Sequence, residues 1–81
     1  MKVVHLMNNQ LLITQIEEIG AEIGEPDCKL IEPYILNQST LELEPWLLNI
    51  TMQNEFMISS DKILTLADPT SKLLKKYEDL F

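Results

Sequence analysis

Arginine is absent from this chain of 81 residues, and its only cations are six lysines, set against thirteen acidic residues for a net charge of −7. Arginine is the residue best suited to bidentate contacts with phosphates and base edges. Affinity for a nucleic-acid backbone comes largely from cations that displace counterions. The composition therefore disfavours RNA or DNA as a partner, although Lys72, Lys75 and Lys76 form one local cluster of positive charge.

Cysteine and histidine are equally scarce, with one residue of each type, Cys28 and His5. One thiol cannot form an internal disulfide, and one thiol with one imidazole is too few for a zinc site. We expect Cys28 to be a small core residue and His5 to have a structural or surface role. The sequence thus predicts neither a metal nor a cofactor.

Paired acidic groups are the remaining candidates for chemistry. Glu42 and Glu44 alternate on a predicted strand, so they share one face, and with Glu32 or Asp27 they could hold a divalent cation. A solvated acidic face is the simpler interpretation. No pair of groups has the spacing that proton transfer or nucleophilic attack requires, so the sequence predicts a protein that is not an enzyme.

Long apolar runs are also missing. None approaches the roughly 20 residues that span a bilayer, and the first ten residues lack the apolar core of a signal peptide. We expect a single soluble, cytoplasmic domain over residues 1–81. A core of this size supplies only about 3–5 kcal/mol, and an internal disulfide and a zinc site are excluded, so association with further subunits is the expected source of stability.

Short apolar stretches separated by turn residues run through residues 2–67. They read "KVVHLM", "LLITQIEEIGA", "CKLIEPYILN", "LELEPWLLNITM" and "FMISSDKILTLA". This rhythm predicts a small barrel or sandwich of about five strands, its second strand strongly bent. A helix over residues 15–23 is the alternative for part of the second stretch, weakened by Gly20 and Gly24. Pro33 cannot donate to a ladder, which places it on an edge or a bulge.

The last stretch, "DPTSKLLKKYEDLF", predicts a helix over about residues 69–80, capped by Asp68 and with Pro69 in its first turn. Its apolar side chains fall on one stripe, which is the predicted packing face: Leu73, Leu74, Tyr77, Leu80 and Phe81. Such a short helix is marginal in water, so packing must stabilise it. It covers either its own barrel or a neighbouring subunit.

This order of elements resembles the Sm-like (LSm) fold, a strongly bent five-stranded barrel related to SH3-like barrels. The segment "SSDKILTLADPTSKLLKKYEDLF" is similar to the tail of small Sm-like proteins of unknown role encoded by marine tailed phages. The resemblance implies a phage-encoded protein of the host cytoplasm. It also implies a ring of five to seven copies, in which the fourth strand of one copy pairs with the fifth strand of the next. The implied interface residues are Leu47, Leu48, Ile50, Met52, Phe56 and Ile58.

The chain departs from the Sm family where that family reads RNA. The loop "EIGEPD" has no asparagine, and "ITMQNEFMISS" offers Gln53 and Asn54 but no cation. The helix is also at the end of the chain rather than at the start, so no RNA-binding residues carry over. Trp46, with Gln53 and Asn54, is the candidate ligand surface, because an exposed indole can stack on a base, a sugar or a proline-rich peptide. A tryptophan that is partly core and partly interface is the simpler expectation.

Together these features predict a non-enzymatic, homo-oligomeric Sm-like interaction or scaffold protein with a possible protein partner. Two alternatives remain open at this point. One is a single-stranded RNA binder, as in other Sm proteins. The other is an acidic mimic of nucleic acid that occupies the basic groove of a host protein.

Overall fold

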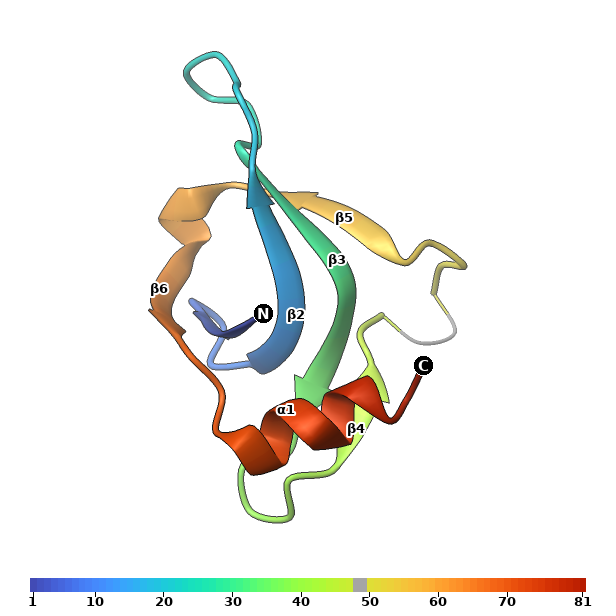
Figure 1. Cartoon of the computed structure of the whole chain (residues 1–81). Coiled ribbons are helices and arrows are strands. Elements are labelled where there is room, and N and C mark those ends of the chain that lie inside the picture. Colours follow the sequence, from blue (N-terminus) through green and yellow to red (C-terminus); the bar gives the residue numbers. More distant parts are fainter. Residues whose placement is uncertain (48–49) are drawn as a thin grey trace.

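A computed structural model describes residues 1–47 and 50–81 as one curved antiparallel sheet followed by a helix (Figure 1). The strands are β1 (Lys2–Leu6), β2 (Leu11–Glu18), β3 (Cys28–Leu36), β4 (Leu43–Pro45), β5 (Glu55–Ile58) and β6 (Ile63–Ala67); a 3₁₀ turn, η1 (Ser60–Lys62), precedes β6, and the helix is α1 (Ser71–Glu78). The predicted mainly β fold with a C-terminal helix is confirmed. It has six strands rather than five, because the last predicted stretch contains two strands, β5 and β6, separated by η1.

The sheet is open rather than a closed barrel. Its strand order is β4-β3-β2-β1-β6, and β5 pairs with β3. One edge of β3 pairs with β2. The other edge of β3 is shared by two strands: β5 pairs with the first residues of β3, and β4 pairs with its last residues. Within the described residues, β6 pairs only with β1, so each end of the sheet has a strand with one unpaired edge.

A tight turn joins β1 to β2, as the sequence predicts. Asn9 has a φ of 67°, a left-handed conformation that asparagine tolerates well. The Asn8 side chain accepts a hydrogen bond from the Gln10 amide at 3.1 Å and donates one to the Gln10 side chain at 3.0 Å. These local bonds fix the position of the Gln10 side chain.

A bulge bends β3 at Glu32 and Pro33. Ile13 pairs with Tyr34 and Gln15 with Ile31, so two residues of β3 lie opposite one residue of β2. The structure thus places Pro33 on a bulge in a central strand, which is one of the two positions predicted for it. Glu32 has a φ of 52°, in the left-handed region that is strained for a residue with a side chain.

Hydrogen bonds from four different segments satisfy the backbone of this bulge. The Thr14 hydroxyl donates to the Ile31 carbonyl at 2.9 Å, and the Glu32 amide donates to the Asn54 carbonyl at 2.7 Å. The Trp46 amide donates to the Pro33 carbonyl at 3.0 Å, and the Tyr77 hydroxyl donates to the Glu32 carbonyl at 2.7 Å. Since buried backbone groups without partners are costly, these bonds hold the strained bend in place.

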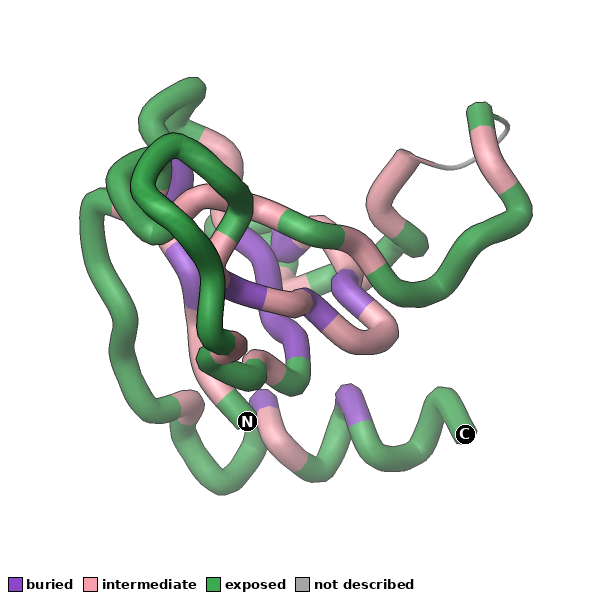
Figure 2. The backbone as a smooth tube through the Cα atoms, turned by 90° about the horizontal axis from the view of Figure 1, so that it is seen from above, coloured by how far each residue is buried: buried purple, intermediate pink, exposed green. Residues whose placement is uncertain are grey.

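Apolar side chains are buried on both faces of the sheet. The inner cluster consists of Val4, Leu6, Leu12 and Leu30, and the helix cluster consists of Ile13, Leu36, Leu73 and Tyr77. Neighbouring residues of a strand point to opposite faces, which is why Leu12 and Ile13 belong to different clusters. Viewed from above, the buried positions lie along the middle of the sheet and at two points of the helix (Figure 2).

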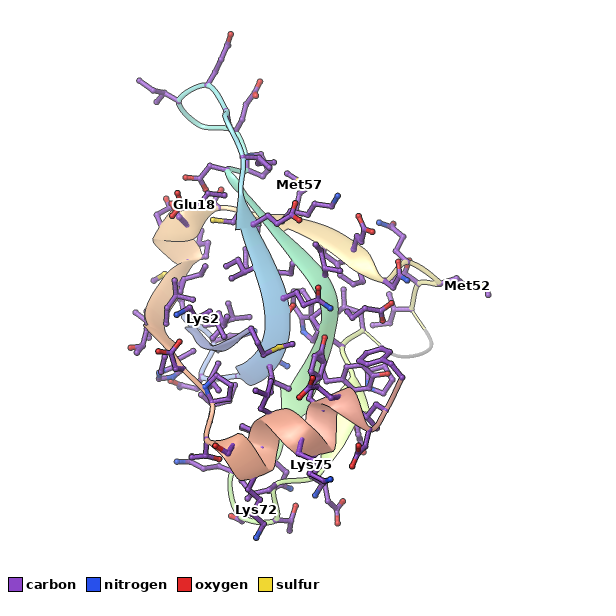
Figure 3. The ribbon with its side chains drawn as sticks, in the orientation of Figure 1. Lys2, Glu18, Met52, Met57, Lys72 and Lys75 are labelled. Carbon is purple, nitrogen blue, oxygen red and sulfur yellow. The ribbon has the colours of Figure 1, made fainter. Side chains whose placement is uncertain are left out.

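The helix begins two residues later than predicted, and its cap differs. Thr70 is the N-cap, and its hydroxyl accepts a hydrogen bond from the Leu73 amide at 3.2 Å. Asp68 was predicted to be the cap, but its carboxylate forms an ion pair with Lys2 instead. The helix packs on its own sheet, while Lys72 and Lys75 project away from it (Figure 3).

The predicted packing face of α1 is divided along its length. Leu73 and Tyr77 are buried, Leu74 is half-buried, and Leu80 and Phe81 are exposed. The ring of Phe81 still meets the ring of Tyr77 edge-on, with centroids 5.1 Å apart. Contact with the sheet is therefore strongest in the first two turns.

The predicted strand over residues 41–52 is wrong beyond Pro45. β4 ends there, and Leu47 has a φ of 59°, which an extended strand does not contain. The amide of Ile50 turns back to the Leu47 carbonyl at 3.1 Å. The alternative helix over residues 15–23 is also wrong, because β2 continues to Glu18.

Candidate functional site

The predicted subunit interface divides into two parts in the structure. Phe56 and Ile58 lie on β5, with one edge of that strand unpaired, whereas Leu47, Ile50 and Met52 lie outside the strands. Leu48 was also predicted here and lies outside the described residues. Leu47, Ile50 and Met52 are therefore not part of a strand edge in this structure.

Among the described residues, the other unpaired edge belongs to β6, whose leucines are not among the predicted interface residues. Leu66 pairs with Val4 and so lies on the inner face, yet it is 50% exposed. Leu64 is 56% exposed and lines the same hollow. The alternation of "ILTLA" predicts the strand, but only the pairing with Val4 shows that Leu66 faces inward, and only the lining of the hollow places Leu64 beside it.

An apolar hollow of about 440 Å³ lies where the inner face is left uncovered. Ile16, Cys28, Ile63, Leu64 and Leu66 supply its apolar lining, and Lys2 and Glu18 also line it. We call these seven residues the β6 trough. In Figure 1, β6 and β2 stand on either side of this region, with the N-terminus between them.

Cys28 is buried beside the trough, and burial raises the pKa of its thiol, with the nearby Asp27 and Glu18 carboxylates acting in the same direction. A raised pKa leaves little reactive thiolate at neutral pH. Asp27 itself accepts hydrogen bonds from the Ser60 hydroxyl at 2.8 Å and the Ser60 amide at 2.7 Å, which lower the pKa of its carboxyl. These bonds attach the base of the β2–β3 loop to η1, so Asp27 has a structural role.

Trp46 lies half-buried against the inner cluster, and three contacts fix it. Its ring meets Phe56 edge-on at 5.4 Å, and its indole N–H donates to Gln10 Oε1 at 3.3 Å. Its backbone amide binds the bulge at Pro33. Asn8, Gln10 and Glu44 line one hollow with the indole, and the sequence does not predict them as a group because two segments far apart in the chain supply them.

Gln53 and Asn54, the other predicted ligand residues, do not join Trp46. The Gln53 side chain donates to the Glu55 carbonyl at 3.2 Å, and the Asn54 side chain donates to Glu32 Oε1 at 2.8 Å. Both side chains therefore hold the segment that leads into β5. Asn54 also braces the bulge, through the backbone bond to Glu32 described above.

Acidic residues do not gather into a metal site in the part of the chain that the structure describes. No group of three or more His, Cys, Asp or Glu side chains is placed to hold a metal ion among residues 1–47 and 50–81. Glu42 and Glu44 line a hollow with Ile35 and Asn37, apart from Asp27. His5 is half-buried on β1.

The whole chain matches a known protein family. A protein family described as a family of unknown function, DUF6561, matches residues 1–81. The chain belongs to this family. No curated protein matches it. Membership of DUF6561 covers the whole sheet and the helix, and it brings no activity, ligand or partner with it. No helix within the described residues of this family member is long and apolar enough to cross a membrane.

Proposed function

We propose that this chain is a non-enzymatic, Sm-like interaction protein that assembles with copies of itself through its two free sheet edges. The observation that carries the proposal is the uncovered trough on the inner face at β6. Leu66 lies on the inner face and Leu64 lines the same hollow, yet both are half exposed, so apolar surface next to the core is left in contact with water. Covering this surface with a neighbouring strand would remove it from water.

The edges themselves support pairing between copies. β6 carries no charged residue and no proline over Ile63–Ala67, although natural edge strands are usually protected by such residues; its one irregularity is a register shift at Leu64. β5 has one edge on β3 and exposes Met57, which is 50% accessible, on its surface (Figure 3). Since β5 and β6 are different surfaces, their pairing is head-to-tail and closes a ring when the rotation between copies permits.

This arrangement revises the interface that the sequence suggested. In the Sm resemblance the fourth and fifth strands pair between neighbours, and here β5 and β6 take those places. Phe56 and Ile58 stay in the proposed interface, Leu64 and Leu66 join it, and the segment from Leu47 to Met52 leaves it. The phage origin, the host cytoplasm and a ring of five to seven copies follow from the resemblance and belong to the same proposal.

The test is the mass of the chain in solution, measured by size-exclusion chromatography with light scattering. We expect a species of five to seven copies of the 9.4 kDa chain that persists at moderate salt. Leu64→Lys should shift the mass towards one copy, because it places a charge in the apolar trough. Leu80→Lys makes the same change at an exposed position of the helix end and should leave the assembly intact.

Two results would contradict the proposal. One is a monomer at every concentration tested. The other is an assembly that Leu64→Lys leaves unchanged while circular dichroism confirms that the variant is folded.

A further inference from the structure

A groove with charge of opposite sign at its two ends runs past Trp46. Its middle is a hollow of about 490 Å³ lined by Trp46, Asn8 and Glu44 among others. Asn8 and Trp46 also line a second hollow of about 270 Å³ that reaches Lys62. Glu44 lines a third hollow of about 200 Å³ that reaches Glu42. The shared residues make the three hollows one continuous surface, the Trp46 groove.

The indole at the centre of this groove is held before any ligand arrives. The Gln10 side chain binds its N–H, Phe56 supports its edge, and its backbone is attached to the bulge. The turn at Asn8 and Asn9 in turn fixes Gln10. A rigid aromatic side chain costs little further entropy on binding, which is why tryptophan is enriched among the residues that dominate binding energy.

Charge decides which ligand the groove fits. The described residues contain two ion pairs between side chains, Lys2 with Asp68 and Lys29 with Glu55, so Glu42 and Glu44 have no cationic partner among them. Lys62, at the other end of the groove, likewise has no acidic partner among the described residues. A phosphate backbone would meet the two glutamates with repulsion, whereas a lysine or arginine side chain would be attracted to them.

We propose that the Trp46 groove binds an extended peptide segment of a partner protein, with an apolar or proline side chain on the indole and a lysine or arginine at Glu42 and Glu44. Proline-containing segments are already extended, so they lose little entropy on binding, and their rings pack on aromatic side chains. The excess of acid over the whole chain adds long-range attraction for such a basic segment. The residues proposed to contact the peptide, Trp46, Glu42 and Glu44, lie outside β5 and β6, and β5 takes part only through Phe56, which supports the indole.

Trp46 provides its own readout, because it is the only tryptophan in the chain. The probe is a seven-residue peptide of alternating leucine and proline that ends in two lysines. It is compared with the same peptide ending in two glutamates, and with one in which serine replaces leucine and proline. Binding is followed by indole fluorescence and by the single indole N–H signal in NMR spectra of the full chain.

We expect saturable binding of the lysine peptide and at least about tenfold weaker binding of both comparison peptides. Glu42→Gln combined with Glu44→Gln keeps the side-chain shape and should weaken the lysine peptide about five- to tenfold. The matched control, Glu22→Gln combined with Glu25→Gln, changes the net charge equally on the β2–β3 loop and should have little effect at moderate salt.

Three results would overturn the inference. The indole signals could fail to respond to the lysine peptide at millimolar concentration. The two double variants could weaken binding equally, which would mean that the peptide is attracted by the net charge of the chain and not by Glu42 and Glu44. The indole signals could shift with protein concentration alone, which would assign the groove to a second copy of this chain.

Discussion

The two faces of the sheet bury apolar side chains in different ways. The outer face is covered by one short helix, which contributes Leu73 and Tyr77 to the helix cluster. The inner face covers itself by curling, and its cluster comes from β1, β2 and β3 with support from Trp46 and Ile63. The curl stops short of closure, so the β6 trough remains open. A local element thus completes one face, while the other keeps an uncovered apolar hollow among the described residues.

Deletion of residues 69–81 is the largest test of this difference. It removes two buried side chains, Leu73 and Tyr77, from the outer face, worth about 3–6 kcal/mol together, and it leaves the Glu32 carbonyl without the Tyr77 hydroxyl that donates to it. We expect the deleted chain to lose most or all of its cooperative unfolding transition in urea. A shorter deletion of residues 79–81 is the control and should cost much less. An equally stable protein after the long deletion would show that the helix is not part of the core.

Leu12→Ala tests the inner face. Leu12 is fully buried, and its truncation should lower the free energy of unfolding by about 2–5 kcal/mol in a urea titration. Leu66→Ala removes the same atoms from the half-exposed trough and should cost a small fraction of this in the unassembled chain. Equal costs at the two positions would mean that the trough is closed in solution even without a partner.

Tyr77→Phe tests the link between the helix and the bulge. The variant keeps the ring but leaves the Glu32 carbonyl without its hydroxyl donor, and we expect a loss of about 1–3 kcal/mol. Tyr34→Phe is the matched control, because the Tyr34 hydroxyl makes no side-chain hydrogen bond among the described residues. If both substitutions cost the same, the Tyr77 hydroxyl does not hold the bend.

The same tyrosine predicts a loss of stability at alkaline pH. Burial raises the pKa of Tyr77 to about 12, above its value near 10 in an unfolded chain. Stability from this group is therefore complete below pH 10 and falls as the pH rises towards 12, because the unfolded state loses the proton first. Thermal unfolding of the wild type and of Tyr77→Phe between pH 8 and about 11.5 should show the wild type losing its advantage. A constant difference across this range would contradict the pKa.

Thr70→Ala should have the smallest effect, and it tests whether Thr70 or Asp68 caps the helix. Loss of the Thr70 hydroxyl should lower stability by about 1 kcal/mol. Asp68→Ala should change the thermal midpoint less, because Asp68 is exposed and binds Lys2 rather than the helix. A larger loss of stability from Asp68→Ala than from Thr70→Ala would indicate that Asp68 caps the helix.

Local chemistry in the sequence was enough to predict several of these features. Asparagine in the first turn, proline in β3 and the apolar stripe of the helix each act through their own backbone or their nearest neighbours. The features that the sequence does not predict depend on contacts between residues far apart in the chain. Asp68 is drawn from the helix by Lys2, at the opposite end of the chain. The inward position of Leu66 depends on its pairing with Val4, and the surroundings of Trp46 depend on a bulge braced by four segments.

Hydrogen exchange along the backbone tests most directly whether a second copy completes the inner face. It would be measured on the full chain at a high concentration and after dilution. We predict that β5 and β6 exchange slowly when concentrated and rapidly when diluted, while β2 and β3 stay protected throughout. Rapid exchange of β6 at every concentration, with unchanged protection elsewhere, would contradict the account and leave the trough as open surface.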